Sequence, residues 1–214
     1  VDGSDVLVMF FTPGTHKEQG LQYSPLKALI SPRPIGWISS ISAQGVANLS
    51  PYSFFNAIAE LPPMVMFIST PDARNENKNG EKDSLANILE IKEFGVNIVG
   101  MHQAEPMVTS SQAVGAEIDE FAHAGLEKKK ANKISVPLVA GAPAHLECTY
   151  YDHITLPDNG RGASSVMVMG HIVGIHIEEE IIQDGLIDVT RYQPVARLGY
   201  KDYANIRDVF AMSP

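Results

Sequence analysis

The chain has 214 residues, a length that suits one well-buried core, and its 44% hydrophobic and 19% charged residues are typical of a folded domain rather than a disordered one. Its formal net charge of −9 at pH 7 argues against a nucleic-acid partner, because phosphates require a basic surface. No apolar run approaches the roughly 20 residues that span a bilayer, so no membrane partner is expected.

Apolar runs rich in β-branched and aromatic residues recur along the chain and predict strands. Turn clusters separate them, and the pair Asn159-Gly160 predicts a hairpin tip. We therefore expect a mainly β fold, a β-barrel with a few helices, antiparallel and Greek-key-like. The predicted strands cover residues 35–41, 64–69, 94–99, 145–151, 165–177 and 181–187.

Three segments predict helices. Residues 83–91 have apolar side chains at helical spacing, and Asp83 and Ser84 are good N-cap residues. Residues 104–112 carry a proline in the first turn, where its missing N–H costs nothing. A third helix is predicted over residues 203–212.

Cys148 is the only cysteine, so no disulfide can form within the chain and a cytoplasmic location is expected. It lies in an apolar run, which favours a buried structural thiol over a nucleophile.

The sequence lacks the motifs of several common enzyme classes: G-x-S-x-G, G-x-x-x-x-G-K-[ST], G-x-G-x-x-G and H-E-x-x-H. Its seven histidines show no metal-ligand spacing. His171 and His176 are five residues apart in a predicted strand and are expected on opposite faces of it. We therefore expect no metal site and no catalytic side chain.

Short hydroxyl and amide side chains gather with aromatic residues between positions 31 and 56. At the ends of strands, such groups suit a planar, phosphorylated ligand that is rich in heteroatoms. Ordinary strand-end and core packing is the alternative for each residue, above all for the aromatic ones. The candidate binding residues here are Trp37, Ser39, Ser40, Asn48, Ser53, Phe54 and Phe55.

A polar loop precedes the first predicted helix and brings Lys82, Asp83 and Ser84 to its start, with Arg74 upstream. A helix N-terminus offers free N–H groups and a positive dipole end, and a lysine and a hydroxyl complete a phosphate cradle. Alone, this pattern also fits a capped helix with charged flanks. Together, the two segments supply what a flavin mononucleotide (FMN) needs: a wall for the ring and a cradle for the phosphate.

Four motifs occur in a specific order: S-P-R-P-I-G-W-I-S-S at 31–40, N-L-S-P-Y-S-F-F-N at 48–56, K-D-S-L-A-N-I at 82–88 and R-L-G-Y at 197–200. In this order they resemble the flavin reductase-like family of FMN-binding split barrels, which includes flavoredoxins. Tyr200 stands where the family's R-x-G-G element has its second glycine.

The resemblance extends from about residue 26 to residue 210. We accordingly expect an N-terminal extension over residues 1–25 and a split-barrel domain over 26–214. The resemblance also implies a homodimer with FMN near the subunit interface.

The resemblance further implies places for individual side chains around the flavin. The ring and ribityl chain would lie along the first two strands, and the phosphate would lie by the loop and helix that follow a third. The residues would be Trp37, Ser39 and Ser40 on the first strand, Asn48, Ser53, Phe54 and Phe55 on the next, Ser69 at the end of the third, and Arg74, Lys82, Asp83 and Ser84 by the phosphate.

The leading functional hypothesis is an NAD(P)H-dependent flavin reductase. Hydride would pass from the nicotinamide to flavin N5, so the protein mainly positions two cofactors. The alternative is a flavoredoxin-type FMN electron carrier without its own small-molecule turnover, and a third hypothesis keeps the barrel but binds pyridoxal phosphate or haem. An oxygenase or electron-acceptor protein is the expected partner. No ribose-binding motif separates NADH from NADPH.

Overall fold

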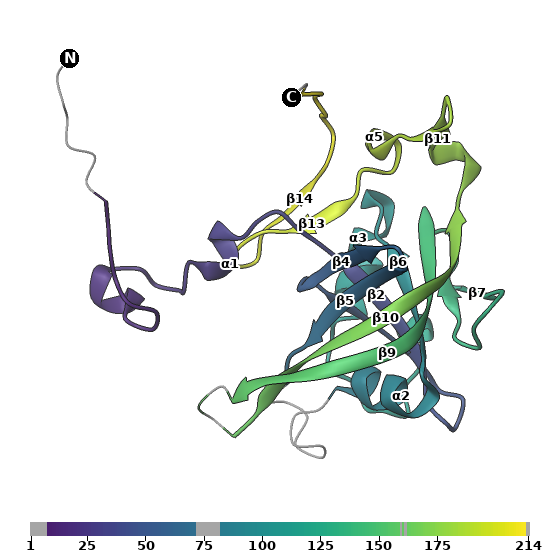
Figure 1. Ribbon diagram of the computed structural model, residues 1–214, viewed down its shortest axis with the longest axis horizontal. Helices are drawn as coiled ribbons and strands as arrows, with labels where there is room; N and C mark the ends of the chain where they lie inside the picture. Colours follow the sequence, from purple (N-terminus) through teal and green to yellow (C-terminus); the bar gives the residue numbers. More distant parts are fainter. Residues whose placement is uncertain (1–7, 72–81, 159, 161, 213–214) are drawn as a thin grey trace.

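Seven antiparallel strands form the main sheet of the computed structural model, which describes residues 8–71, 82–158, 160 and 162–212. The predicted mainly β, antiparallel fold is confirmed (Figure 1). The strands, in spatial order, are β3 (Ala47–Tyr52), β2 (Gly36–Ile41), β6 (Glu93–Ile98), β9 (Ala144–Asp158), β10 (Ser164–Ile177), β5 (Pro63–Ser69) and β4 (Phe55–Glu60).

A small sheet beside the main one joins residues 33–34 to residues 195–205, while residues 8–25 extend away from it (Figure 1). Arg33 is buried there and donates to the carbonyls of Lys27, Ile30 and Leu198, which ties the N-terminal segment to the C-terminal one. The elements are α1 (Leu26–Leu29), β1 (Arg33–Pro34), β13 (Val195–Arg197) and β14 (Tyr203–Asn205), with the 3-10 helix η1 (His16–Gln19) before them.

Tyr200 lies in the turn between β13 and β14 with a φ of 55°. This left-handed conformation is one that glycine adopts without strain. The backbone therefore retains the geometry of a glycine at a position where the sequence has tyrosine.

The first predicted helix is confirmed as α2 (Asp83–Ile91). The helix begins at Asp83, so its N-cap is Lys82 rather than Asp83 or Ser84, and its buried face is made of Ser84, Leu85, Asn87 and Ile88. None of the helices among the described residues is long and apolar enough to cross a bilayer.

The second predicted helix is shorter than expected, and the third is wrong. The second consists of the 3-10 helix η3 (Met101–Gln103) followed by α3 (Ala104–Thr109). Instead of a third helix, β14 pairs with β13, and residues 206–212 have no regular structure. Backbone pairing with β13 takes up the start of this segment, and its large apolar side chains Val209, Phe210 and Met212 are exposed.

The strand predicted over residues 181–187 is also wrong. Residue 181 ends the 3-10 helix η4 (Glu179–Ile181), and residues 182–187 form a hairpin of two short strands. Asp184 and Gly185 have positive φ in the turn of this hairpin. The other short elements are α4 (Glu120–His123), β7 (Lys128–Lys129), β8 (Leu138–Val139), β11 (Ile182–Gln183), β12 (Leu186–Ile187) and α5 (Val189–Tyr192).

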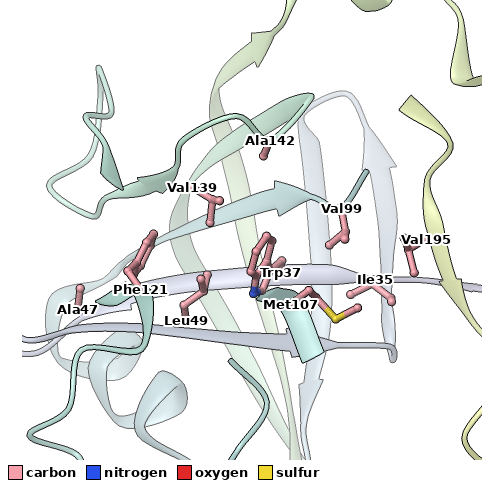
Figure 2. Packing of buried hydrophobic residues seen from close by; sticks show 10 residues of the cluster. All are labelled: Ile35, Trp37, Ala47, Leu49, Val99, Met107, Phe121, Val139, Ala142 and Val195. Atoms are coloured by element: carbon pink, nitrogen blue, oxygen red, sulfur yellow. The ribbon is translucent and has the colours of Figure 1, made fainter. Parts of the chain in front are cut away.

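Two hydrophobic clusters lie on opposite faces of β2, because successive side chains of a strand alternate. Ile38 belongs to the cluster inside the barrel, which α2 joins through Leu85 and Ile88. Trp37 belongs to the cluster on the other face, shown in Figure 2. That second cluster comprises Ile35, Trp37, Ala47, Leu49, Val99, Met107, Phe121, Val139, Ala142 and Val195.

The long hairpin β9–β10 is interrupted by bulges that change the direction of its side chains. His171 pairs with Thr149 and His176 with His145, so five residues of β10 span four of β9. Paired residues point to the same face of a ladder, and the two histidines therefore share a face. The prediction of opposite faces is wrong for this reason. The predicted hairpin tip falls at Asn159, which is outside the described residues.

Candidate functional site

Asn48 on β3 lies at the centre of a buried polar network that joins two strands to α2. Its Oδ1 accepts hydrogen bonds from Ser84 Oγ at 2.7 Å and from Ser40 Oγ at 3.2 Å. Ser40 in turn accepts from Asn87 Nδ2 at 3.2 Å. The network brings together three of the residues predicted for FMN binding, Ser40, Asn48 and Ser84, although they come from three separate elements.

Hydroxyl groups gather around Tyr52 beside the start of α2. The Tyr52 hydroxyl donates to Ser84 Oγ at 2.9 Å. Burial raises the pKa of Tyr52 to about 12, although hydrogen bonds with the side chains of Ser84, Ser50 and Ser69 act against this. The Lys82 ammonium lies 5.0 Å from the centre of the Tyr52 ring. Hydroxyls, a lysine and a helix N-terminus are therefore concentrated in one place, which is a donor set that suits a phosphate.

Glu120 at the start of α4 closes the other end of the network. Its two carboxylate oxygens accept from Asn48 Nδ2 at 2.7 Å and from the backbone N–H of Leu49 at 2.9 Å. Burial raises the pKa of Glu120 to about 7, and repulsion from Asp83 and Asp119 adds to this, while the two hydrogen bonds act in the opposite direction. A buried carboxyl group thus titrates near neutral pH beside the network.

A cavity of about 440 Å³ lies on the Glu120 side of Asn48. Its lining includes Asp83, Glu90, Glu117 and Glu120. Four carboxyl groups make this cavity a poor site for a phosphate. Lys82, Tyr52 and Ser84 do not line this cavity, so the donor set and the group of carboxyls are separate.

The turn between β3 and β4 places Ser53 and Phe54, followed by Phe55 as the first residue of β4, at the end of the strand that carries Asn48 and Tyr52. All three are half-buried. The Phe54 ring centre lies 5.8 Å from the Lys27 ammonium and 5.9 Å from the Arg33 guanidinium carbon. Phe55 packs closely over Gly36, where an added Cβ would come within 2.6 Å of its ring. This turn is a partly open, aromatic surface next to the hydroxyl cluster.

Two of the predicted residues, Trp37 and Ser39, lie on the face of β2 that points away from α2. Both have no exposed surface, and Trp37 Nε1 donates to Ser110 Oγ at 2.9 Å. Asn97 Nδ2 donates to the Trp37 carbonyl at 2.9 Å and lies 3.4 Å from Ser39 Oγ. These side chains support the strand from behind the network rather than joining it. Ser69 ends β5 and is buried, whereas the predicted residue Arg74 is outside the described residues.

Sequence reasoning missed Tyr52, Asn87 and Glu120. A signal existed for the first two, because Asn48, Ser50 and Tyr52 alternate on one face of a strand and Asn87 lies three residues after Ser84 on a helix. Glu120 is 72 residues from Asn48 and carried no local signal. Among the described residues, no three His, Cys, Asp or Glu side chains are grouped to hold a metal ion.

Comparison with known proteins decides the family. The model of the flavin reductase like domain matches residues 29–196. The chain belongs to the flavin reductase-like family. An uncharacterized member from Aquifex aeolicus (strain VF5) is 32% identical over 182 residues, which are 85% of this chain and 88% of that protein.

Solved structures of this flavin reductase-like fold are similar to this chain over nearly its whole length. Nitrilotriacetate monooxygenase component B from Bacillus cereus has a TM-score of 0.86 at 27% identity, covering 96% of this chain and 99% of that one. A split-barrel protein from Shewanella frigidimarina NCIMB 400 has a TM-score of 0.78 at 22% identity, covering 97% and 99%. The predicted family and its split-barrel fold are thus confirmed.

Proposed function

We propose that this chain binds FMN and is an NAD(P)H:flavin oxidoreductase. The observation that carries the proposal is the cluster of hydroxyls around Tyr52, with Lys82 and the start of α2 beside it, next to the aromatic turn at Phe54. Membership of the flavin reductase-like family makes a flavin the expected ligand. Bound FMN would supply two-electron redox chemistry, which the side chains of the protein do not supply themselves.

The residues of the chain have distinct roles in this proposal. Lys82, Ser84 and the N–H groups at the start of α2 hold the phosphate, with Asp83 in the same turn. Asn48 and Ser40 fix the position of Ser84, and Ser69 adds a hydroxyl next to Tyr52. The turn formed by Ser53, Phe54 and Phe55 borders the ring and limits access of water to one side of it. Trp37 and Ser39 hold β2 in place from behind, and Arg74 is proposed as a further phosphate ligand from its sequence position.

An absorption spectrum of the purified protein, recorded anaerobically before and after addition of NADH or NADPH, tests the function. We expect the spectrum of oxidised flavin first and its bleaching by at least one of the two nucleotides. Bound FMN that neither nucleotide bleaches would instead favour an electron carrier of the flavoredoxin type. A colourless protein that does not take up added FMN would contradict both.

Substitution of Lys82 tests the position of the phosphate. Lys82→Gln removes the charge next to the hydroxyl cluster, so FMN should bind about tenfold more weakly, whereas riboflavin, which lacks the phosphate, should bind unchanged. Lys92→Gln is the matched control, because Lys92 caps the opposite end of the same helix. Equal losses for FMN and riboflavin would place the phosphate elsewhere.

We further propose that the protein is a homodimer that delivers electrons to a partner oxygenase or electron-acceptor protein. The similar Bacillus cereus protein is component B of a monooxygenase, which supports a partner of this kind. Oxygen-dependent turnover of a candidate oxygenase, measured with and without this chain and NAD(P)H, would test the delivery. Turnover that does not depend on this chain would contradict it.

A further inference from the structure

The directions of the hydrogen bonds in the polar network follow from groups that can only donate or only accept. The Leu49 N–H can only donate, and an ionised Glu120 can only accept. Asn48 therefore turns Nδ2 toward Glu120 and Oδ1 toward Ser84 and Ser40. As a result, the Ser84 hydroxyl donates its proton to Asn48 and accepts one from Tyr52. With Glu120 ionised, Ser84 has no proton to offer to a ligand.

A phosphate at the start of α2 needs hydrogen-bond donors. If Glu120 is protonated, Asn48 is no longer required to donate to it, and the amide can rotate so that Nδ2 faces Ser84 Oγ. The Ser84 O–H is then released toward the phosphate. The same proton also removes a negative charge close to an arriving dianion, so both effects favour binding to the protonated form.

We propose that Glu120 is a positioning residue for the phosphate end of the site, and that the protein takes up a proton at Glu120 when FMN binds. The inference rests on the proposed binding of FMN, and it adds a pH dependence to that binding that the residues in contact with the phosphate do not supply. Glu120 acts through Asn48 and need not touch the ligand.

The charged and titratable groups around Glu120 support a protonated form near neutral pH. Asp83 and Glu90 of α2 line the same cavity as Glu120, Glu117 and Asp119 flank it in its own segment, and Tyr52 lies on β3. A nearby cation is Lys128 of β7, which is paired with Asp119. Lys82 is next to Asp83, on the phosphate side. The pKa of Glu120, about 7 without ligand, is raised further by a bound phosphate. FMN affinity is therefore highest below pH 7 and falls as the pH rises above it.

Isothermal titration of the apoprotein with FMN, in two phosphate-free buffers that differ in ionisation enthalpy, measures the proton directly. Between pH 7 and 8.5 we expect net proton uptake by the wild type and an FMN dissociation constant about fourfold larger at the upper end, as a shift of one unit in the pKa of Glu120 predicts over this interval. Glu120→Gln should abolish both effects. The phosphate of FMN itself titrates near pH 6, outside this window.

Two controls test whether Glu120 is the group that takes up the proton and whether the uptake requires the phosphate of the ligand. Glu117→Gln changes a carboxyl group of the same cavity that has no hydrogen bond to Asn48 in the described structure, and it should behave as wild type. Riboflavin has no phosphate and should bind without proton uptake. Proton uptake that is unchanged in Glu120→Gln, or equal for riboflavin, would overturn the inference while leaving FMN binding intact.

A second measurement needs no variant and serves if Glu120→Gln fails to fold. An infrared difference spectrum of the wild type, with FMN minus without, should show a new C=O band from a protonated carboxyl group at pH 7.5. Its absence would overturn the inference. Failure of FMN to bind at all would overturn the proposed function and this inference together, whereas FMN binding without proton uptake at Glu120 would overturn the inference alone.

Discussion

Trp37 packs in the core, which its place in a binding motif did not reveal. It has no exposed surface and its indole N–H is satisfied by Ser110. Trp37→Phe should lower the free energy of unfolding by about 1–3 kcal/mol, because packing is lost and Ser110 Oγ loses the indole donor, although it still donates to the Met107 carbonyl. FMN affinity, measured by fluorescence quenching, should change less than twofold.

The control for Trp37 is Ser110→Ala, which keeps the ring but leaves a buried N–H without an acceptor. It should destabilise the protein in urea unfolding and likewise leave FMN affinity unchanged. A large loss of FMN affinity in Trp37→Phe but not in Ser110→Ala would mean that the indole contacts the flavin after all.

Two buried residues give opposite pH dependences to the stability of the apoprotein. The pKa of Glu120 is raised from 4.5 to about 7, so its contribution is present below pH 4.5 and is lost as the pH rises through 7. Burial first, and then repulsion from Lys129 and His176, lowers the pKa of His145 from 6.5 to about 4, so its contribution is present above pH 6.5 and is lost as the pH falls through 4.

The pH dependences that Glu120 and His145 give to stability partly cancel between pH 4.5 and 6.5 in the wild type. Substitution of either residue should therefore reveal the pH dependence that the other one causes. Glu120→Gln should make the free energy of unfolding fall more steeply on acidification, and His145→Gln should make it fall less steeply or rise. Urea unfolding at three pH values across this window measures both slopes. Parallel curves for the wild type and the two variants would contradict these assignments.

The helices and strands that the sequence predicted are those that depend on a local pattern of residues. The helix α2 and the strands β2, β5, β6, β9 and β10 were predicted from hydrophobic spacing and turn residues, and the motif at 82–88 identified the helix start that meets the hydroxyl cluster. The face shared by His171 and His176 was not predictable, because it depends on a bulge in the pairing with β9. Glu120 was missed for a related reason, since only the folded chain brings α4 to β3.

A glycine at the start of β2 links the sheet to the aromatic turn. A Cβ at Gly36 would lie 2.6 Å from the Phe55 ring, so Gly36→Ala must displace Phe55 and the adjoining turn. We expect a loss of about 1–3 kcal/mol in stability and a severalfold loss of FMN affinity. Gly170→Ala is the matched control, because its Cβ would meet the Phe94 ring at 2.5 Å in the barrel interior. Gly170→Ala should lower stability but leave FMN affinity unchanged. Equal losses of FMN affinity in both variants would contradict a specific role of Gly36 and Phe55 in FMN binding.

The main sheet ends at β4, an edge strand whose side chains from Asn56 to Glu60 are exposed. Ile58 on this strand is 45% exposed and Leu61 in the following turn is 92% exposed. An exposed apolar edge is a liability for a monomer, because it can pair with another chain. We therefore propose the β4 edge as the interface of the proposed homodimer.

Light scattering after gel filtration should give a mass near twice the 23.2 kDa of the chain. The double substitution Ile58→Lys with Leu61→Lys places two charges on the edge and should halve that mass. Leu186→Lys is the matched control, since Leu186 is 74% exposed on β12, outside the main sheet.

Because β4 begins directly after the turn at Phe54, dissociation should also weaken FMN binding by about tenfold. A dimer that survives the double substitution would exclude the β4 edge as the interface, and a monomer with unchanged FMN affinity would mean that one chain completes the site alone.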